Sequence, residues 1–159
     1  MNTGISSIFY SSPVGFMEIA GDRSYIYEIT FLKEGVSPGR SDESTPVLEQ
    51  CKSQLDEYFA GRRKTFDLPL MLRGTPFQKR VWEELAKIPY GKTLSYSDIA
   101  DAIGNPGAVR AVGGANHSNP VSIIIPCHRV IGKDGSLTGY GGGLWKKQWL
   151  LEHERAHIS

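Results

Sequence analysis

The chain has 159 residues, of which 40% are hydrophobic and 22% are charged, and its formal net charge at pH 7 is +1. This length and composition suffice for one domain or two small ones with buried cores, so neither a disulfide framework nor a structural metal is required. The two cysteines match no disulfide or zinc spacing, and no apolar stretch is long enough to span a bilayer. Because the N-terminus has no basic head followed by an apolar core, we expect a protein of the reducing cytoplasm without membrane contact.

The small net charge conceals an asymmetry between the two halves of the chain. Residues 1–72 carry 7 basic and 10 acidic side chains, whereas residues 73–159 carry 11 basic and 7 acidic ones. If the protein binds nucleic acid, the second half is therefore the part that does so. A modest excess of this size is also common on an ordinary solvated surface.

The first third of the chain reads as strands followed by a helix. Strands are favoured in the segments rich in aromatic and β-branched residues: 6–10, 15–20 and 25–32. Turn sequences separate these segments, so we expect an antiparallel meander. After a polar connection over residues 33–44, Thr45 and Pro46 fit the cap and first position of a helix that runs to about Gly61. Cys51 falls on the apolar face of this helix and is expected to be structural.

The second half begins with another helix-start pattern. Thr75 and Pro76, with Gln78 three residues after the cap, predict a helix that ends near Ile88. A shorter helix is expected after Ser95. These patterns predict the α+β class, with a small N-terminal antiparallel sheet domain that carries a helix over residues 1–72. A mainly helical C-terminal domain is expected over residues 73–159.

Two short helices in this domain have the outline of a helix-turn-helix. The first is expected to end at Gly104, and Asn105 with Pro106 then offers a cap and a proline start for the second, which would close at residues 118–120. The second helix consists almost entirely of small residues, which allows either close packing against another helix or close approach to a ligand such as a DNA groove. Arg110 is its one long side chain, and spacing alone favours an ordinary surface arginine over a side chain that enters a groove or fills the gap left by an extruded base.

The sequence IIIPCHRVIG, residues 123–132, places a thiol directly before an imidazole. Val121–Ile125 is predicted to be a buried strand that Pro126 ends, so that Cys127 lies where reactive groups are commonly presented. Successive side chains of an extended chain point to opposite faces, so exchange of a proton between Cys127 and His128 needs a turn or a bridging water. An inert buried thiol beside a structural histidine is the alternative reading.

Two further features accompany this pair. A helix predicted from about Leu144 supplies Glu152 and Glu154 as groups that could orient the imidazole, and spacing does not choose between them. The glycine-rich segment 139–143 could close over a bound ring with Tyr140 as a lid, or could equally be a loose connection.

These motifs together resemble one known family. PCHRV, preceded by AVGGA and NP and followed by GY, GG and WLLEHE, is similar to the O6-alkylguanine-DNA alkyltransferases, also called methylated-DNA–protein-cysteine methyltransferases. The resemblance covers residues 75–155, and the first 70 residues fit the smaller N-terminal domain of the family by outline only. It implies irreversible transfer of an alkyl group from O6-alkylguanine in DNA to a cysteine, with base flipping from the minor groove.

The resemblance also implies roles for individual residues. Cys127 would accept the alkyl group, His128 would act through water as its base, and Glu154 rather than Glu152 would polarise the histidine. Asn119 would tie the recognition helix to the active-site strand. Tyr96 would crowd the target phosphate and hydrogen-bond the flipped guanine, while Arg110 would fill the gap left in the base stack.

Weaker assignments follow from the same resemblance. The residues implied to touch DNA near the lesion are Ser97, Asn105 and Lys133, and those implied to line or support the guanine pocket are Val130, Tyr140, Gly141 and Lys147. Glycine stands at 141 where relatives can have serine, so backbone donation alone is expected there. The chain lacks the ligands of relatives that have an N-terminal zinc site, and no metal or cofactor is implied. The expected partner is double-stranded DNA containing O6-alkylguanine, bound by a monomer, and cooperative binding of several copies is left open.

Two other functions are compatible with parts of the pattern. A cysteine hydrolase built on Cys127, His128 and Glu154 would turn over an acyl substrate through a thioester, but adjacent cysteine and histidine disfavour its geometry. A non-catalytic module that binds alkylated DNA, or a helix-turn-helix regulator, would use the same helices without transfer. The Pro-Cys-His-Arg sequence favours the transferase over this module.

Overall fold

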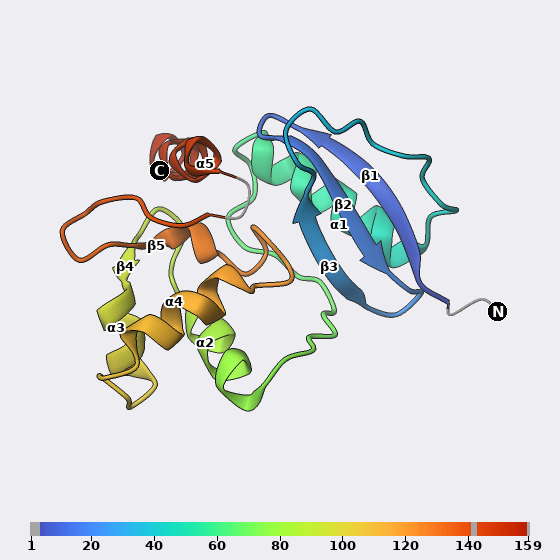
Figure 1. The fold of residues 1–159 in the computed structure, drawn as a ribbon. Coiled ribbons are helices and arrows are strands. Elements are labelled where there is room, and N and C mark those ends of the chain that lie inside the picture. The colour runs from blue at the N-terminus through green and yellow to red at the C-terminus, as the bar shows by residue number, and fades with distance from the viewer. Residues whose placement is uncertain (1–3, 141–142, 159) are drawn as a thin grey trace. The chain divides into compact units, whose positions relative to one another are not determined.

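The computed structural model describes residues 4–140 and 143–158, and the chain divides into two compact units, residues 1–72 and 73–159. The first unit contains a sheet and one helix, and the second is mainly helical (Figure 1). The α+β class predicted from the sequence is confirmed. Within the described residues, no helix has both the length and the apolar character needed to cross a bilayer.

The first unit is an antiparallel meander packed on a helix. Strands β1 (Ser6–Ser12), β2 (Gly15–Gly21) and β3 (Ile26–Phe31) pair in sequence order. Helix α1 (Pro46–Phe59) begins at the predicted proline, and the Thr45 hydroxyl accepts a hydrogen bond from the backbone N–H of Leu48. Ile8, Met17 and Ile29 are buried on the sheet side of this core. Cys51 is fully buried on α1, and burial raises the pKa of its thiol to about 12, so this cysteine is structural.

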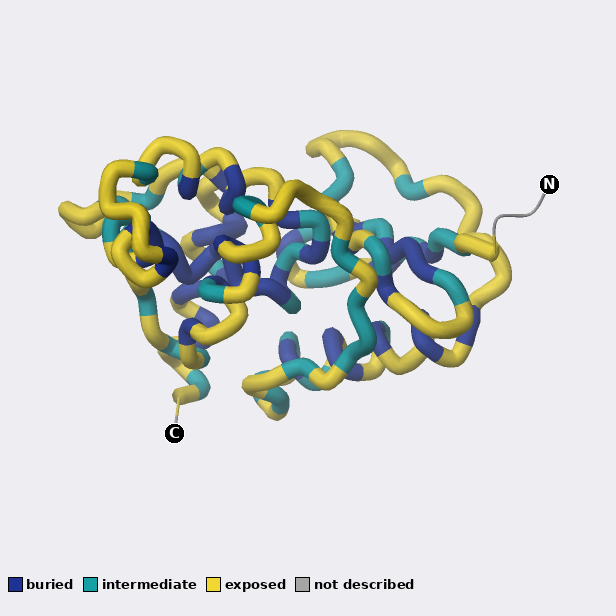
Figure 2. The backbone as a smooth tube through the Cα atoms, turned by 90° about the horizontal axis from the view of Figure 1, so that it is seen from below, coloured by how far each residue is buried: buried dark blue, intermediate teal, exposed yellow. Residues whose placement is uncertain are grey.

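The second unit builds its core from four helices. They are α2 (Pro76–Ala86), α3 (Tyr96–Ala102), α4 (Val109–His117) and α5 (Leu144–Ala156). Two short strands, β4 (Leu94–Ser95) and β5 (Val130–Ile131), pair in parallel, and a 3₁₀ turn, η1 (Cys127–Arg129), directly precedes β5. The buried positions of each unit lie in its interior (Figure 2).

Helix caps and one buried indole fix the helix-turn-helix. Capping boxes start α2 at Thr75 and α3 at Ser95, so the termini of these helices are satisfied locally. Behind them, the Trp82 indole N–H of α2 donates to the Ala115 carbonyl of α4 over 2.8 Å. Because Trp82 is almost fully buried, this bond sets how α4 lies on the core.

Two local predictions for this unit are wrong. The helix expected from Asn105 begins instead at Val109, because the backbone N–H of Ala108 bonds the Asn105 carbonyl and closes a turn first. The run Val121–Ile125 is not a strand. The Ile125 N–H bonds back to the Val121 carbonyl, and Ile123 has φ 74°, a left-handed conformation that is unusual for a β-branched residue. Burial of the run, rather than strand pairing, accounts for its apolar composition.

The capping box of α2 gives a stability prediction. Replacement Thr75→Ala removes the acceptor for the Gln78 N–H, so the free energy of unfolding should fall by about 1 kcal/mol. Thr65→Ala, an exposed position outside the helices, is the matched control and should change it by less than about 0.5 kcal/mol. Urea unfolding of both variants measures the difference, and equal losses would contradict the capping role.

Candidate active site

Cys127 and His128 lie together in the η1 turn. The Pro126 carbonyl accepts from the Arg129 N–H, which closes the 3₁₀ turn directly after the proline. Cys127 is 6% exposed and His128 is fully buried. Because Cys127 and His128 lie in a turn, their side chains are not directed to opposite faces as they would be in an extended chain.

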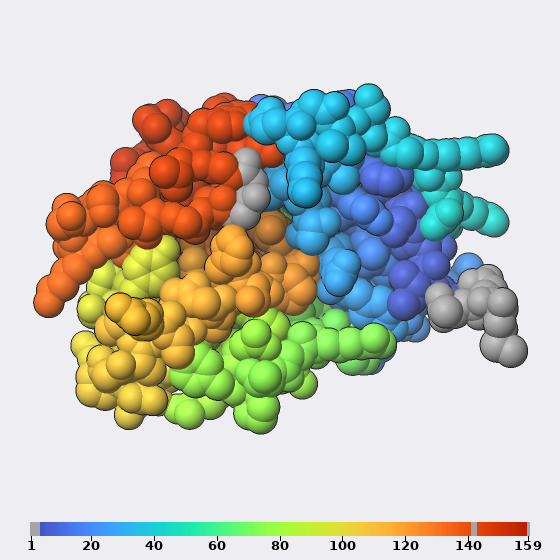
Figure 3. Space-filling model, in the orientation of Figure 1, coloured from blue at the N-terminus to red at the C-terminus, as the bar shows by residue number. Residues whose placement is uncertain are grey.

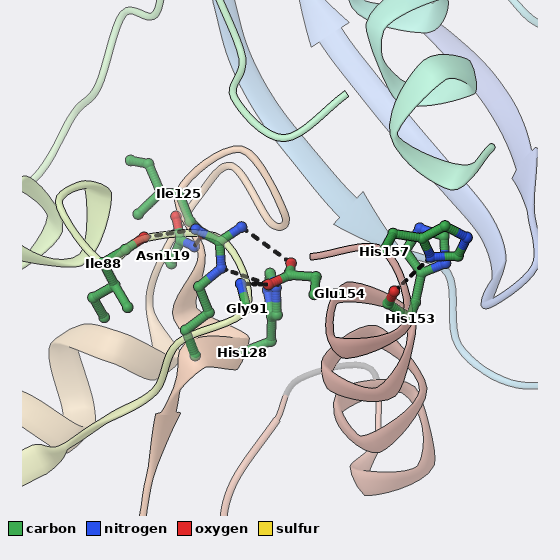
Figure 4. A network of polar contacts seen from close by, with 9 residues as sticks. Ile88, Gly91, Asn119, Ile125, His128, His153, Glu154 and His157 are labelled. Atoms are coloured by element: carbon green, nitrogen blue, oxygen red, sulfur yellow. Dashed lines mark hydrogen bonds and ion pairs between the residues drawn. The ribbon is translucent and has the colours of Figure 1, made fainter. Parts of the chain in front are cut away.

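A buried hydrogen bond joins His128 to helix α5. His128 Nε2 lies 2.6 Å from Glu154 Oε2 (Figure 4). Because the ionised carboxylate only accepts, Nε2 carries the proton and Nδ1 has the free lone pair. Within the described part of the chain, Nδ1 is buried without a hydrogen-bond partner. Burial lowers the pKa of His128 and outweighs the opposing effect of Glu154, so the imidazole is neutral near pH 7.

Arg129, which the sequence analysis did not assign, is the second partner of Glu154. Its Nε and Nη2 donate to the two carboxylate oxygens over 2.8 and 3.1 Å, and its Nη1 donates to the Ile88 carbonyl over 2.7 Å. Burial alone raises the pKa of Glu154, but the hydrogen bonds from His128 and Arg129, together with the charge of Arg129, hold it well below its usual range. A buried, bidentate guanidinium therefore keeps Glu154 ionised.

The electrostatic surroundings of Cys127 keep its sulfur protonated at rest. Burial raises the pKa of the thiol above its ordinary value, and a hydrogen bond from Asn119 and the charge of Lys147 offset part of that effect. Lys147 is itself buried, which lowers its pKa to about 8, and its Nζ donates to the Thr138 carbonyl over 2.8 Å. Reaction at this sulfur therefore needs a base close by.

Two asparagines hold the segment around Cys127: Asn116 near the end of α4 and Asn119 just after it. The Asn119 amide donates to the Ile125 carbonyl over 2.7 Å, and its oxygen accepts from the Val121 N–H over 3.0 Å. The Asn116 amide donates to the Cys127 carbonyl over 3.5 Å. Asn116 was not singled out from the sequence, because nothing local distinguishes it from a solvated polar residue of a short helix.

A groove of about 320 Å³ lies beside α4 on the outer surface of the second unit. It is lined by Tyr96, Val109, Arg110, Gly113, His117, Thr138 and Gly139. The Thr138 hydroxyl donates to the Tyr96 hydroxyl over 3.0 Å, which links the loop after β5 to α3. Figure 3 shows this face, with α3 and α4 in yellow and gold beneath the orange-red loop. Of the residues expected to contact DNA, Tyr96 and Arg110 are thus brought together.

The remaining predicted residues are distributed around this centre. Ser97 lies beside Tyr96 on α3, Asn105 is exposed in the turn before α4, and Lys133 is exposed in the loop after β5, and none of the three lines the groove. Val130 is fully buried in β5 and Tyr140 is almost fully buried. Burial, followed by the charges of Cys127 and Glu154, raises the pKa of Tyr140 well above its ordinary value.

Gly141 and Glu152 complete the residues predicted from the sequence. Gly141 lies outside the described residues. Glu152, the alternative to Glu154, is exposed and accepts from the Gln148 amide instead of facing His128. No group of three or more His, Cys, Asp or Glu side chains that could hold a metal ion occurs in residues 4–140 and 143–158. His153 and His157, at the end of α5, point away from His128 and Glu154 (Figure 4).

Comparison with family models covers both units. Residues 76–156 match the 6-O-methylguanine DNA methyltransferase, DNA binding domain, and residues 5–72 match the 6-O-methylguanine DNA methyltransferase, ribonuclease-like domain. The constitutive methylated-DNA–protein-cysteine methyltransferase of Bacillus subtilis is 58% identical over 151 residues, which cover 91% of this chain and 92% of the relative. That of Mycobacterium bovis is 51% identical over 148 residues, which cover 91% and 89%.

Solved structures agree with these matches. The O6-methylguanine methyltransferase of Mycobacterium tuberculosis superimposes with a TM-score of 0.87 and 47% identity, covering 96% of this chain and 94% of that one. Mycobacterium tuberculosis OGT in complex with DNA gives a TM-score of 0.85 and 49% identity, covering 94% and 92%.

A stability prediction for this site follows from the ion pair between Arg129 and Glu154. Arg129→Met leaves the buried Glu154 carboxylate without its cation, so the free energy of unfolding should fall by about 3 to 5 kcal/mol. Arg155→Met, at an exposed arginine of α5, should change it by less than about 0.5 kcal/mol. Denaturant unfolding at pH 7 compares the two, and a loss for Arg129→Met as small as that of the control would refute the role of the pair.

Proposed function

Because the chain belongs to the 6-O-methylguanine DNA methyltransferase family and repairs O6-methylguanine in DNA by methyl transfer to a protein cysteine, we propose that Cys127 is the acceptor. The observation that carries this assignment is the buried relay in which Glu154 fixes the tautomer of His128, within the same 3₁₀ turn as the thiol. Cys51, the other cysteine, is fully buried in the core of the first unit and has no such base.

In the proposed reaction, His128 removes the proton of Cys127 through one water molecule. The Nδ1 lone pair receives this proton, and the ionised Glu154 stabilises the imidazolium that forms. The thiolate then attacks the methyl carbon, a carbon–sulfur bond forms as the carbon–O6 bond breaks, and the electron pair of that bond returns to the guanine. Lys147 supports the thiolate by its positive charge.

DNA is proposed to meet the protein along α4. Gly113 and the other small residues of this helix let its backbone approach a minor groove closely, and Arg110 fills the gap in the stack when the damaged base is flipped. Flipping costs a few kcal/mol and costs less for a weakly paired damaged base, so part of the selectivity originates in the DNA. Tyr96 crowds the target phosphate and hydrogen-bonds the flipped guanine. Ser97, Asn105 and Lys133 contact the DNA around the lesion.

The flipped base is proposed to enter beside β5 and the start of α5. Val130 and Tyr140 line that pocket, and Lys147 supports it through its bond to the Thr138 carbonyl. Asn119 keeps the catalytic turn attached to α4, since its amide is bonded at both ends. Gly141, expected to donate its backbone N–H to O6, is proposed on the resemblance alone.

The proposed thioether product indicates that each protein molecule reacts only once. Methyl transfer to sulfur leaves a thioether, which has no carbonyl for water to attack, so the acceptor is not regenerated. We therefore propose a stoichiometric reaction of a monomer with double-stranded DNA that carries O6-alkylguanine, in the reducing cytoplasm that a free thiol requires. The second unit carries the positive excess, and its affinity for DNA is expected to fall as salt rises.

Intact mass after mixing with excess duplex containing O6-methylguanine tests the acceptor. The protein should gain the mass of one methylene and no more, and Cys127→Ser should gain nothing while Cys51→Ser behaves as the unchanged chain does. A gain that persists in Cys127→Ser would move the acceptor elsewhere. DNA that stays bound without any gain would favour the non-catalytic binding module, and repeated turnover of an acyl substrate would favour the hydrolase.

The pH dependence of transfer tests the base. Burial lowers the pKa of His128 below its ordinary 6.5, so the imidazole stays neutral at and above that pH and becomes protonated only at lower values. The single-turnover rate with saturating DNA should hence be level through pH 6.5 and fall only at lower pH, where His128 becomes protonated. His128→Gln should slow transfer about 100-fold and abolish the fall in rate at low pH, whereas His157→Gln should keep that fall. If the rate of His128→Gln still fell at low pH, a group other than His128 would cause the pH dependence.

A further inference from the structure

The inner face of α4 carries a buried amide for which the proposed reaction has no use. Asn116 is 3% exposed and lies one residue before the end of the helix. Its Oδ1 is buried and has no hydrogen-bond partner among the described residues. Leaving a buried amide oxygen unpaired is unfavourable, and a leucine of similar size would avoid this. The presence of asparagine at position 116 therefore needs an explanation other than packing.

The donor end of the same amide meets the backbone of Cys127. Asn116 Nδ2 lies 3.5 Å from the Cys127 carbonyl oxygen, at the long limit of a hydrogen bond, and the Val130 N–H donates to the same oxygen. This carbonyl belongs to the residue that must become a thiolate, so its partial negative charge opposes ionisation of the sulfur. A donor that draws closer to the carbonyl offsets that charge.

Asn116 and Asn119 differ in how firmly they are held. Asn119 is bonded at both ends over 2.7 and 3.0 Å, so it is a fixed connection. Asn116 is bonded at one end over a long distance, so its amide can shift without breaking a second bond. The opposite face of α4 carries Arg110, Gly113 and His117, which line the groove proposed for DNA.

We propose that Asn116 is a positioning residue that couples occupation of the α4 groove by DNA to the reactivity of Cys127. When DNA binds against α4, the Asn116 amide tightens onto the Cys127 carbonyl, which orients the catalytic turn and favours the thiolate. This inference rests on the proposed role of Cys127. It assigns Asn116 no contact with DNA or with the alkylated base.

Comparison of two substrates distinguishes coupling from mere stability. Single-turnover methyl transfer is followed by intact mass, first with duplex containing O6-methylguanine and then with O6-methylguanine as the free base. Asn116→Leu removes the donor and keeps the volume, whereas Asn116→Asp keeps the shape but has no donor when ionised. Gln54→Leu, which removes a buried amide of the first unit that bonds the Asp67 backbone, is the matched control for lost stability.

The expected result is a selective loss. Both Asn116 variants should slow transfer from duplex about tenfold, the effect of roughly one hydrogen bond, while the rate with free base changes less than about threefold. Affinity for an unmodified duplex should stay within about twofold, and Gln54→Leu should leave the ratio of the two rates unchanged. Equal slowing with both substrates, or no slowing, would overturn the coupling. Failure of the unchanged chain to gain a methylene would instead refute the proposed acceptor.

Discussion

One buried carboxylate organises the second unit. Glu154 lies on α5 with almost no exposure, and such a group remains ionised only where cations and hydrogen-bond donors replace the lost water. Arg129 supplies both, and the remaining capacity of Oε2 is used by His128. Because His128 and Arg129 come from the η1 turn, the need to satisfy Glu154 fixes the turn against α5, and the Arg129 bond to the Ile88 carbonyl extends this constraint to the end of α2.

The same arrangement explains how a thiol with a raised pKa can serve in a transfer reaction. Burial keeps Cys127 protonated and protects it from the solvent, while the lowered pKa of His128 keeps a neutral base beside it. In the proposed reaction the thiolate then forms where a substrate is present rather than at rest, which suits the proposed single use of each protein molecule.

Helical periodicity gives α4 two different faces, one along the groove and one buried. Arg110, Gly113 and His117 recur at intervals that place them on one side of the helix, along the groove. Val112, Ala115 and Asn116 fall on the buried side, where the Ala115 carbonyl accepts from Trp82. One short helix thus presents small residues on its outer surface and is attached on its inner side to both the core and the η1 turn.

Local chemistry made much of this protein predictable from its sequence. The meander, the caps at Thr45 and Thr75 and the start of α5 depend on neighbouring residues, and so does the placement of Cys127 directly before His128. Contacts between distant segments were not predictable. The partners of Arg129 and Asn116 were decided by burial and by hydrogen bonds between residues 11 to 41 positions apart. The residues adjacent in sequence do not identify such partners, because the hydrogen bonds of a buried polar group depend on which distant segment the fold brings beside it.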